Sequence, residues 1–361
     1  MSAAYPVWLI RLRALLGKEF RQLLRDPRMR FFVFIPPLVQ LVIFGYAATY
    51  DVRLADVAVV DSELSSATRG IVSDISASGH FRIQAFPDMA SAAIALNRSD
   101  VRAIVRFDPD YARSPAIQIV TDGSDSNSAQ LIFGQLAQTI RDSVFRSSGL
   151  SPPVQLEERA WYNPNLEDRE YFIPGIIANL MLITTMILTA MTVVRERELG
   201  TLEQVMVSPL SNLEFIIGKM IPVATIGLID VLLISVVAIL WFHVPFRGSP
   251  LALFAASLLF LMSSLGMGLL ISAYSGTQQQ AMILAFFFVM PFVILSGFAF
   301  PIRNMPEWVQ WFTWIDPLRY YIVVIRDLFL KGGGIFDHLF EYGMMSLLGV
   351  VSMGLSLFHL R

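Results

Sequence analysis

The sequence contains no cysteine among its 361 residues, and only 16% of its residues are charged, compared with about a quarter in soluble domains. The lack of cysteine excludes disulfides, thiolate catalysis and cysteine-ligated metals. The shortage of charge, with 55% hydrophobic residues, excludes an ordinary soluble enzyme. The formal net charge of -2 gives no basic excess, so we expect no nucleic-acid partner.

Catalytic and metal-binding patterns are also missing. The four histidines are widely separated and form no metal-ligand pair, and no G-x-S-x-G motif is present. The Gly-Lys pairs Gly17-Lys18 and Gly218-Lys219 are not followed by Ser or Thr, so neither forms a P-loop for nucleotide phosphates. We therefore expect no catalytic residue, no metal site and no ATP hydrolysis by this chain itself.

Long apolar stretches predict membrane-spanning helices. A helix that crosses about 30 Å of hydrocarbon needs about 18 to 25 apolar residues, and it satisfies its own backbone hydrogen bonds in lipid. The sequence predicts six: Phe31–Tyr50, Tyr171–Val194, Met220–Phe246, two in the uncharged stretch Gly248–Ile302 that the polar residues Ser275–Gln280 separate, and Tyr342–Leu360. The predicted fold class is an all-α polytopic membrane domain, with residues 171–361 holding five of the helices.

Charge indicates which side of the membrane each part faces. Residues 1–30 carry seven basic and two acidic side chains, whereas residues 51–170 carry 11 basic and 17 acidic ones. Because cytoplasmic segments are rich in Lys and Arg, we expect a cytoplasmic N-terminus and an external domain at 51–170. The stretch after the fifth span does not follow this rule, since it would place Arg303, Arg319, Arg326 and Lys331 outside.

The segment between the first two spans has the pattern of a soluble α/β domain. Short strands are predicted at Leu54–Val60, Phe81–Phe86, Val101–Phe107 and Ala116–Val120, and helices at Ser65–Ala77, Asp88–Asn97 and Ser128–Phe145. An inserted extracytoplasmic α/β domain is therefore expected. Before the first span, Val7–Arg25 has the pattern of an amphipathic helix that lies on the cytoplasmic membrane surface.

Two helix starts follow the second span. Gly200 is placed to end one helix, and Thr201 with Gln204 is a capping-box pattern that opens a short helix limited by Pro209. Ser211 with Glu214 repeats the pattern at the head of the third span.

The short helix, about 201–208, would expose one apolar face formed by Leu202, Val205 and Met206. It is either a plain loop with one helical turn or an element that docks into a groove of another protein.

A tryptophan-rich segment follows the fifth span. Pro301 and Pro306 interrupt the helix, and Trp308, Trp311 and Trp314 recur at a spacing of three. Because indole rings favour the lipid headgroup level, we expect a helix in the outer membrane interface and a second one up to Leu330, together forming outer re-entrant helices at about 301–330.

Asp230 is the one acidic residue within the predicted spans, and such a residue costs about 2.5 to 3.5 kcal/mol at the bilayer centre. It indicates either proton coupling in an ion-coupled secondary transporter, a polar contact between helices, or a residue in a wet cavity. A further possible function of the whole chain, independent of Asp230, is that of a membrane anchor for the α/β domain.

Together these residues resemble the membrane subunits of type-2 ATP-binding-cassette (ABC) exporters, in particular bacterial inner-membrane permeases with a large periplasmic domain. The resemblance covers nearly the whole chain. The motifs that carry it are Val194–Glu203 with Ser208-Pro209 and Gly218-Lys219, Ser296–Pro301 with Met305-Pro306, Asp316–Leu318, and, in the N-terminal helix, Lys18-Glu19 with Arg25–Pro27.

The resemblance implies roles for particular residues. Those implied for coupling to an ATPase are Lys18, Glu19, Glu196, Glu198, Gly200, Thr201, Leu202, Glu203, Met206 and Pro209. Those implied for the outer re-entrant region are Gly297, Pro301, Met305, Pro306, Trp308, Trp311 and Pro317. Residues 1–30 would be the connecting helix.

It also implies partners and a direction of transport. A separate ABC ATPase subunit would bind ATP and Mg, so this chain would bind no cofactor itself. A second permease, identical or paralogous, would complete a path lined mainly by the first, second and fifth spans, and a periplasmic adaptor could join them. The expected function is the export of an amphipathic or hydrophobic, drug-like or lipid-like substrate across the bacterial inner membrane.

Overall fold

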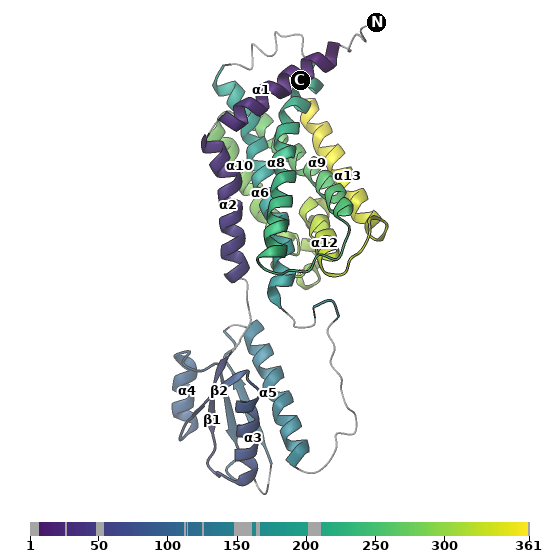
Figure 1. The fold of residues 1–361 in the computed structure, drawn as a ribbon. Coiled ribbons are helices and arrows are strands. Elements are labelled where there is room, and N and C mark those ends of the chain that lie inside the picture. Colours follow the sequence, from purple (N-terminus) through teal and green to yellow (C-terminus); the bar gives the residue numbers. More distant parts are fainter. Residues whose placement is uncertain are drawn as a thin grey trace. The chain divides into compact units, whose positions relative to one another are not determined.

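The chain divides into two compact units in a computed structural model, residues 50–159 and residues 1–49 with 160–361. We call them the sheet unit and the helical unit (Figure 1). The structure describes residues 7–25, 27–47, 54–111, 113, 115–124, 126–147, 161–163, 167–200 and 211–359. The second part of the helical unit begins at residue 160, and its helix α6 begins at Asp168. The end predicted for the external domain, residue 170, stays a prediction.

The sheet unit contains a four-stranded mixed sheet with the order β2-β1-β3-β4. Its strands are β1 (Ala55–Val60), β2 (Phe81–Ala85), β3 (Ala103–Phe107) and β4 (Ile117–Thr121), of which only β4 runs antiparallel to its neighbour. The four predicted strands are confirmed to within about two residues at each end.

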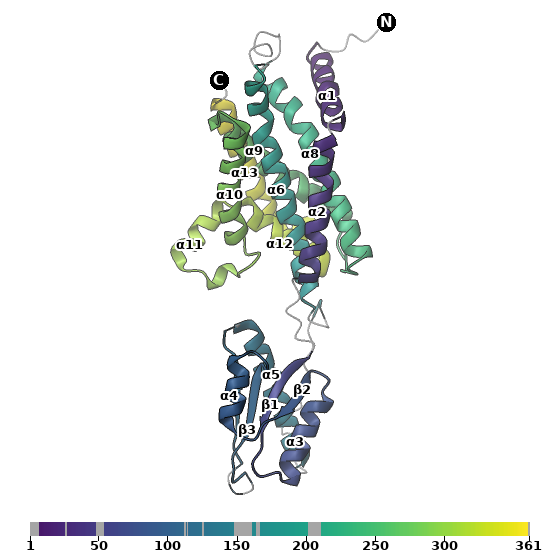
Figure 2. The ribbon, with the colours of Figure 1, turned by 90° about the vertical axis from the view of Figure 1, so that its left-hand side faces the viewer.

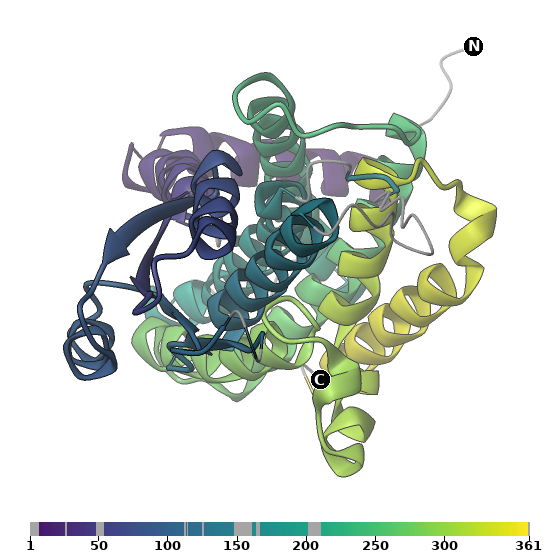
Figure 3. The same cartoon turned by 90° about the horizontal axis from the view of Figure 1, so that it is seen from below.

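Three helices cover this sheet: α3 (Ser66–Ala77), α4 (Met89–Asn97) and α5 (Ser126–Ser147). Buried residues of α3 and α5 pack on one face and those of α4 on the other, and Figure 3 shows α4 across the strands from α3. The side chains of Ser65 and Asp88 cap α3 and α4 by accepting from the backbone N–H groups of Thr68 and Ser91. Helices α3 and α4 therefore begin where the sequence predicted, since Ser65 and Asp88 are capping residues that can be recognised in the sequence.

The helical unit is built mainly from long helices. They are α1 (Val7–Arg25), α2 (Pro27–Ala47), α6 (Asp168–Glu198), α8 (Asn212–Leu240), α9 (Pro250–Tyr274), α10 (Gln278–Leu295), α12 (Pro317–Leu330) and α13 (Leu339–His359). Between α10 and α12 lie the 3-10 turn η1 (Ile302–Asn304), α11 (Glu307–Phe312) and the turn η2 (Thr313–Ile315), and η3 (Ile335–His338) precedes α13.

Five of the described helices are long and apolar enough to cross a membrane: α6, α8, α9, α10 and the helical stretch Ile335–His359. The predicted first span, 31–50, falls on α2, and the side chains described there form the apolar stretch Ile35–Tyr46. The predicted break at Ser275–Gln280 is confirmed, because α9 ends at Tyr274 and Thr277 caps α10.

The predicted third span, Met220–Phe246, is wrong at its end. Helix α8 stops at Leu240, and His243, with a positive φ of 56°, lies in the irregular segment that leads to Pro245. Pro245 lacks the backbone N–H that would continue the helix. The prediction was too long because it followed the apolar composition alone, which continues past Leu240.

Packing in the helical unit centres on α6, which contacts α2, α8, α9, α10 and α12. Small residues let other helices approach closely. A Cβ added to Gly266 on α9 would lie 2.1 Å from the Ser352 hydroxyl on α13, so this pair requires glycine. Figure 2 shows α6, α9, α10 and α13 side by side in the bundle.

Candidate functional site

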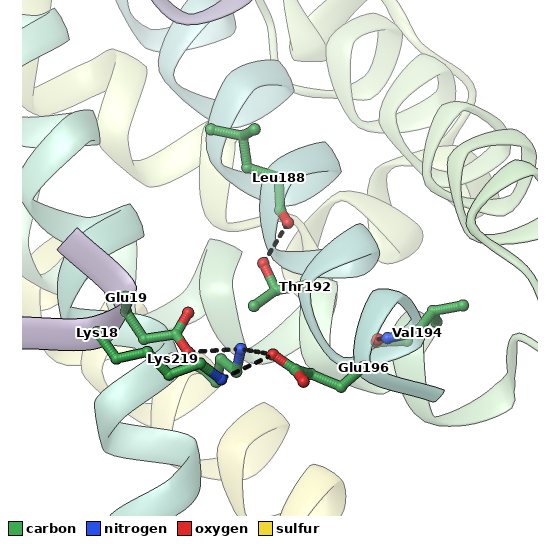
Figure 4. Close-up of polar contacts among 8 residues, drawn as sticks. Lys18, Glu19, Leu188, Thr192, Val194, Glu196 and Lys219 are labelled. Carbon is green, nitrogen blue, oxygen red and sulfur yellow. Dashed lines mark hydrogen bonds and ion pairs between the residues drawn. The ribbon is translucent and has the colours of Figure 1, made fainter. Parts of the chain in front are cut away.

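A group of charged side chains is buried where α1, α6 and α8 meet, and we call it the buried charge cluster. The Lys219 ammonium on α8 lies 2.8 Å from the Glu19 carboxylate on α1 and 2.6 Å from the Glu196 carboxylate on α6. Lys18 lies 3.4 Å from Glu196 and 3.6 Å from Glu19 (Figure 4). The cluster joins α1 to α6 and α8, which lie more than 140 residues further along the chain. We refer to this part of the bundle as the α1 end.

The central residues of the cluster are shielded from solvent. Glu19, Glu196 and Lys219 are 8%, 4% and 4% exposed, whereas the side chain of Lys18 is 48% exposed. Two carboxylates therefore face one buried and one half-exposed ammonium group, and the formal charges balance. Removing one partner of a buried ion pair leaves an uncompensated charge, which typically costs about 3 to 5 kcal/mol.

Close packing beside Lys219 brings the cluster together. A Cβ added to Gly218 would lie 2.2 Å from Leu15 on α1, so only glycine lets α1 approach α8 at this point. Leu15 itself is 8% exposed and fills this contact. The Gly218-Lys219 pair thus combines a helix contact with a buried cation.

A cavity of about 70 Å³ opens next to the cluster. Glu19, Glu196 and Lys219 are among its polar lining residues, and Leu188, Met191 and Val223 are among its apolar ones. Thr192 also lines the cavity, and its hydroxyl donates its proton to the carbonyl of Leu188 at 2.6 Å. Toward the cavity this hydroxyl can therefore act only as an acceptor. The volume is enough for a few water molecules beside the charges.

The C-terminal end of α6 is also bound to the end of α9 and the start of α10. The Val194 N–H donates to the Ser272 hydroxyl at 3.3 Å, and the Arg197 guanidinium donates to the Ser275 carbonyl at 2.8 Å. The Glu198 carboxylate accepts from the backbone N–H of Gln278 at 2.8 Å and from its side-chain amide. Glu198 therefore helps to cap the first turn of α10.

Gly200 ends α6 as predicted, with a positive φ of 68° that favours glycine. The predicted capping box at the head of α8 is confirmed, because the Ser211 hydroxyl accepts from the Glu214 N–H and the Glu214 carboxylate accepts from the Ser211 N–H. The expected coupling helix lies between these points. Five of its predicted residues, Thr201, Leu202, Glu203, Met206 and Pro209, lie outside the described residues.

The outer residues singled out in the sequence lie between α10 and α12. Gly297 has a positive φ of 83°, Pro301 and Pro306 immediately precede η1 and α11, and Met305 follows η1. Trp308, Trp311 and Trp314 are 69%, 78% and 47% exposed, and Figure 2 shows α11 projecting from the bundle. Large exposed aromatic surfaces suit the membrane interface predicted for them, but their insertion there stays a prediction.

The start of α12 follows the predicted Asp316-Pro317 pair. Pro317 occupies the first turn, and the carboxylate of the buried Asp316 accepts from the Leu318 N–H at 2.9 Å. The basic residues here that conflicted with the charge rule are partly engaged within the protein. Lys331 pairs with Asp327 at 3.6 Å, and the Arg319 guanidinium lies 5.1 Å from the ring centre of Trp314.

The family of the chain follows from comparison with known proteins. The family model described as ABC-2 family transporter protein matches residues 27–358. The chain belongs to this family.

Relatives match this ABC-2 chain over most of their own length. The chain is 33% identical to "Probable multidrug ABC transporter permease YbhR" of Escherichia coli strain K12 over 331 residues, which cover 89% of this chain and 90% of the relative. It is 32% identical to "Probable multidrug ABC transporter permease YbhS" of the same strain over 339 residues, 89% of both chains. "Inner membrane transport permease YhhJ" from that strain is 24% identical over 88% of both chains.

This ABC-2 protein is therefore a multi-pass membrane permease of the ABC transporter class, as the sequence motifs predicted. The family assignment does not favour the ion-coupled alternative. In the described parts of the chain no group of three or more His, Asp or Glu side chains could hold a metal ion.

Asp230 lies within α8 and is 2% exposed. Its Oδ2 atom has no hydrogen-bond partner among the described residues. The structure thus places this acid in the protein interior rather than facing lipid.

We expect Asp230→Asn to keep transport within about twofold of the unchanged chain, because a helix contact or wet cavity needs a polar group and not a titratable one. Uptake or efflux of a fluorescent amphiphile measured in membrane vesicles tests this, with Asp230→Leu as the control that removes the polar group. Loss of transport in Asp230→Asn, with normal assembly and ATP hydrolysis, would instead favour proton coupling.

Lys219, the central cation of the buried charge cluster, was not singled out by the sequence reasoning, although the Gly218-Lys219 motif was noted. The sequence did contain a signal: a single cation lies in the first turns of an apolar helix. A cation needs a carboxylate partner when it is buried. Of the predicted coupling residues, Lys18, Glu19 and Glu196 meet around it, whereas Glu198 contacts α10.

Proposed function

We propose that this chain is the permease subunit of an ATP-driven ABC exporter for amphipathic or hydrophobic compounds. The family match over residues 27–358 carries the proposal, and the naming of YbhR and YbhS as multidrug permeases supports a drug-like or lipid-like substrate. ATP and Mg would bind to a separate ATPase, and a second permease, identical or paralogous, would complete the transport path. A periplasmic adaptor is a further candidate partner.

The buried charge cluster supports a role in coupling to that ATPase. It connects α1, the last turn of α6 and the first turns of α8. In the sequence, Glu196 precedes the proposed coupling segment at 201–208 and Lys219 follows it. A force applied to this segment would reach all three helices through short, buried ionic contacts. We propose that ATP-driven closure of the two ATPases moves the permease helices through this connection.

The direct test is purification of the chain together with a candidate ABC ATPase from the same organism. We expect a stable complex whose ATP hydrolysis rises when an amphiphilic dye is added and whose vesicles export the dye. A permease that transports the dye along an ion gradient without any ATPase would contradict the proposal.

We propose six membrane spans, with α2 as the first, in the bacterial inner membrane and with a cytoplasmic N-terminus. The sheet unit would then lie outside, and the α11 and α12 segment would form the outer re-entrant helices. The support is the basic residues at 1–30, the acidic excess at 51–170 and the five further apolar helices.

We expect single cysteines at Ser124 and Ser208 to react from opposite sides of the membrane. Because the chain has no cysteine of its own, each variant carries one thiol. An impermeant maleimide should label Ser124→Cys in spheroplasts and Ser208→Cys only after lysis. Equal labelling of both in intact spheroplasts would rule out the six-span arrangement.

A further inference from the structure

Helix α10 depends on α6 for its position. It is the least buried of the five candidate spans, and it packs mainly on α6, with smaller contacts to α9, α11 and α12. The contacts between α6 and α10 therefore decide how far α10 moves independently.

The two helices are connected at the α1 end. Arg197 reaches the Ser275 carbonyl, and Glu198 accepts from the first backbone N–H of α10 at Gln278. A carboxylate at a helix N-terminus satisfies a free N–H and is favoured by the helix dipole.

A second connection lies at the opposite end of the two helices. A Cβ added to Gly175 on α6 would lie 2.6 Å from the ring of Phe298, so the ring fits against α6 only because residue 175 is glycine. The same ring meets the ring of Phe172 edge-on, with centres 6.0 Å apart. Phe298 thereby joins the segment just beyond α10 to the first turns of α6.

Arg326 on α12 closes this second connection. Its guanidinium lies 3.7 Å from the ring centre of Tyr171 and donates to the Tyr171 hydroxyl at 2.9 Å. It also donates to the carbonyls of Gly297 and Phe298, each at 3.3 Å. Only the planar, five-donor guanidinium reaches α6 and the segment after α10 at the same time.

We infer that Arg326 and Phe298 hold the end of α10 on α6, so that the two helices move as one rigid body during transport. The inference concerns motion within this permease and does not depend on where the ATPase docks. Its consequence is that the path opens between this helix pair and other parts of the transporter, such as a second permease, and not between α6 and α10.

A disulfide between α6 and the segment after α10 tests the rigid body in the assembled transporter. Gly175→Cys combined with Phe298→Cys replaces the ring contact by a covalent one, and the absence of native cysteine makes the bond unique. We expect dye export by the oxidised form to equal or exceed that of the reduced form. Export that stops on oxidation and returns on reduction, with the ATPase still bound, would overturn the inference.

The role of Arg326 is tested in the same cysteine pair by the rate of disulfide formation. We expect Arg326→Met, and also Arg326→Lys, to slow cross-linking by about tenfold, since the lost charge-assisted hydrogen bonds let the two thiols separate. The matched control is Arg303→Met, which removes an exposed arginine on η1. Equal cross-linking rates in folded Arg326 and Arg303 variants would show that Arg326 does not hold α10.

Discussion

Replacing Lys219 by methionine is expected to destabilise the contact between α1 and α8 by about 3 to 5 kcal/mol, the usual cost of removing one partner from a buried ion pair. Glu19 and Glu196 would lose the ammonium that lies 2.8 and 2.6 Å away, while the half-exposed Lys18 stays 3.6 and 3.4 Å from them. The physical cause is desolvation, since two buried carboxylates would lose the counter-charge that is buried with them.

Hydrogen exchange measures this effect locally. In the purified permease, the backbone amides of α1 should exchange about 150- to 5,000-fold faster in Lys219→Met, because a helix that loses about 3 to 5 kcal/mol of stability opens correspondingly more often. ATPase retention should fall as well if the cluster supports the docking segment.

Lys18→Met is the matched control because it removes the same charge from the same cluster. The Lys18 side chain is 48% exposed and that of Lys219 is 3% exposed, so we expect the effect of Lys18→Met to stay within about 1 kcal/mol. In addition, Lys219→Met combined with Glu196→Gln should recover part of the lost protection, since it removes one orphaned charge. Equal effects of Lys18→Met and Lys219→Met would show that the cluster is not a buried unit.

The local pattern of the sequence was enough to predict where most helices and strands begin and end. The capping residues Ser65, Asp88 and Ser211 each lie where the pattern placed a helix start, and Thr277 lies within the predicted break. Such signals act within one turn of backbone, so they can be recognised from neighbouring residues alone. The segment after Leu240 shows the limit, because apolar composition continued past the point where the helix stops.

The contacts between helices could not be predicted in the same way. Nothing near Lys219 in the sequence indicates that its partners are 200 residues upstream and 23 residues upstream, and Arg326 gives no local sign that it binds Tyr171. The basic residues after the fifth span illustrate the consequence. Arg326 counted against the predicted sidedness as a free charge, whereas in the structure its donors are used by Tyr171 and two carbonyl groups.

The coupling proposal depends most directly on the segment 201–208. We expect the double variant Leu202→Glu with Met206→Glu to abolish binding of the ATPase to this segment. The sequence predicts that these side chains share the apolar face of a short helix, four residues apart. If a groove of the ATPase covers that face, two unpaired charges would be buried, at several kcal/mol each, and binding would weaken by orders of magnitude. The permease should still be made and inserted at its normal level.

Gln204→Glu is the matched control, since it adds a charge to the same segment away from the predicted apolar face. On a solvated surface such a change typically stays within about 0.5 kcal/mol. Co-purification of the ATPase and dye export per ATP hydrolysed distinguish the two variants. If the double variant kept both the ATPase and normal export, residues 201–208 would not be the coupling helix. The contact would then have to lie elsewhere, first at the exposed side of α1 around Lys18, where the buried charge cluster reaches the surface.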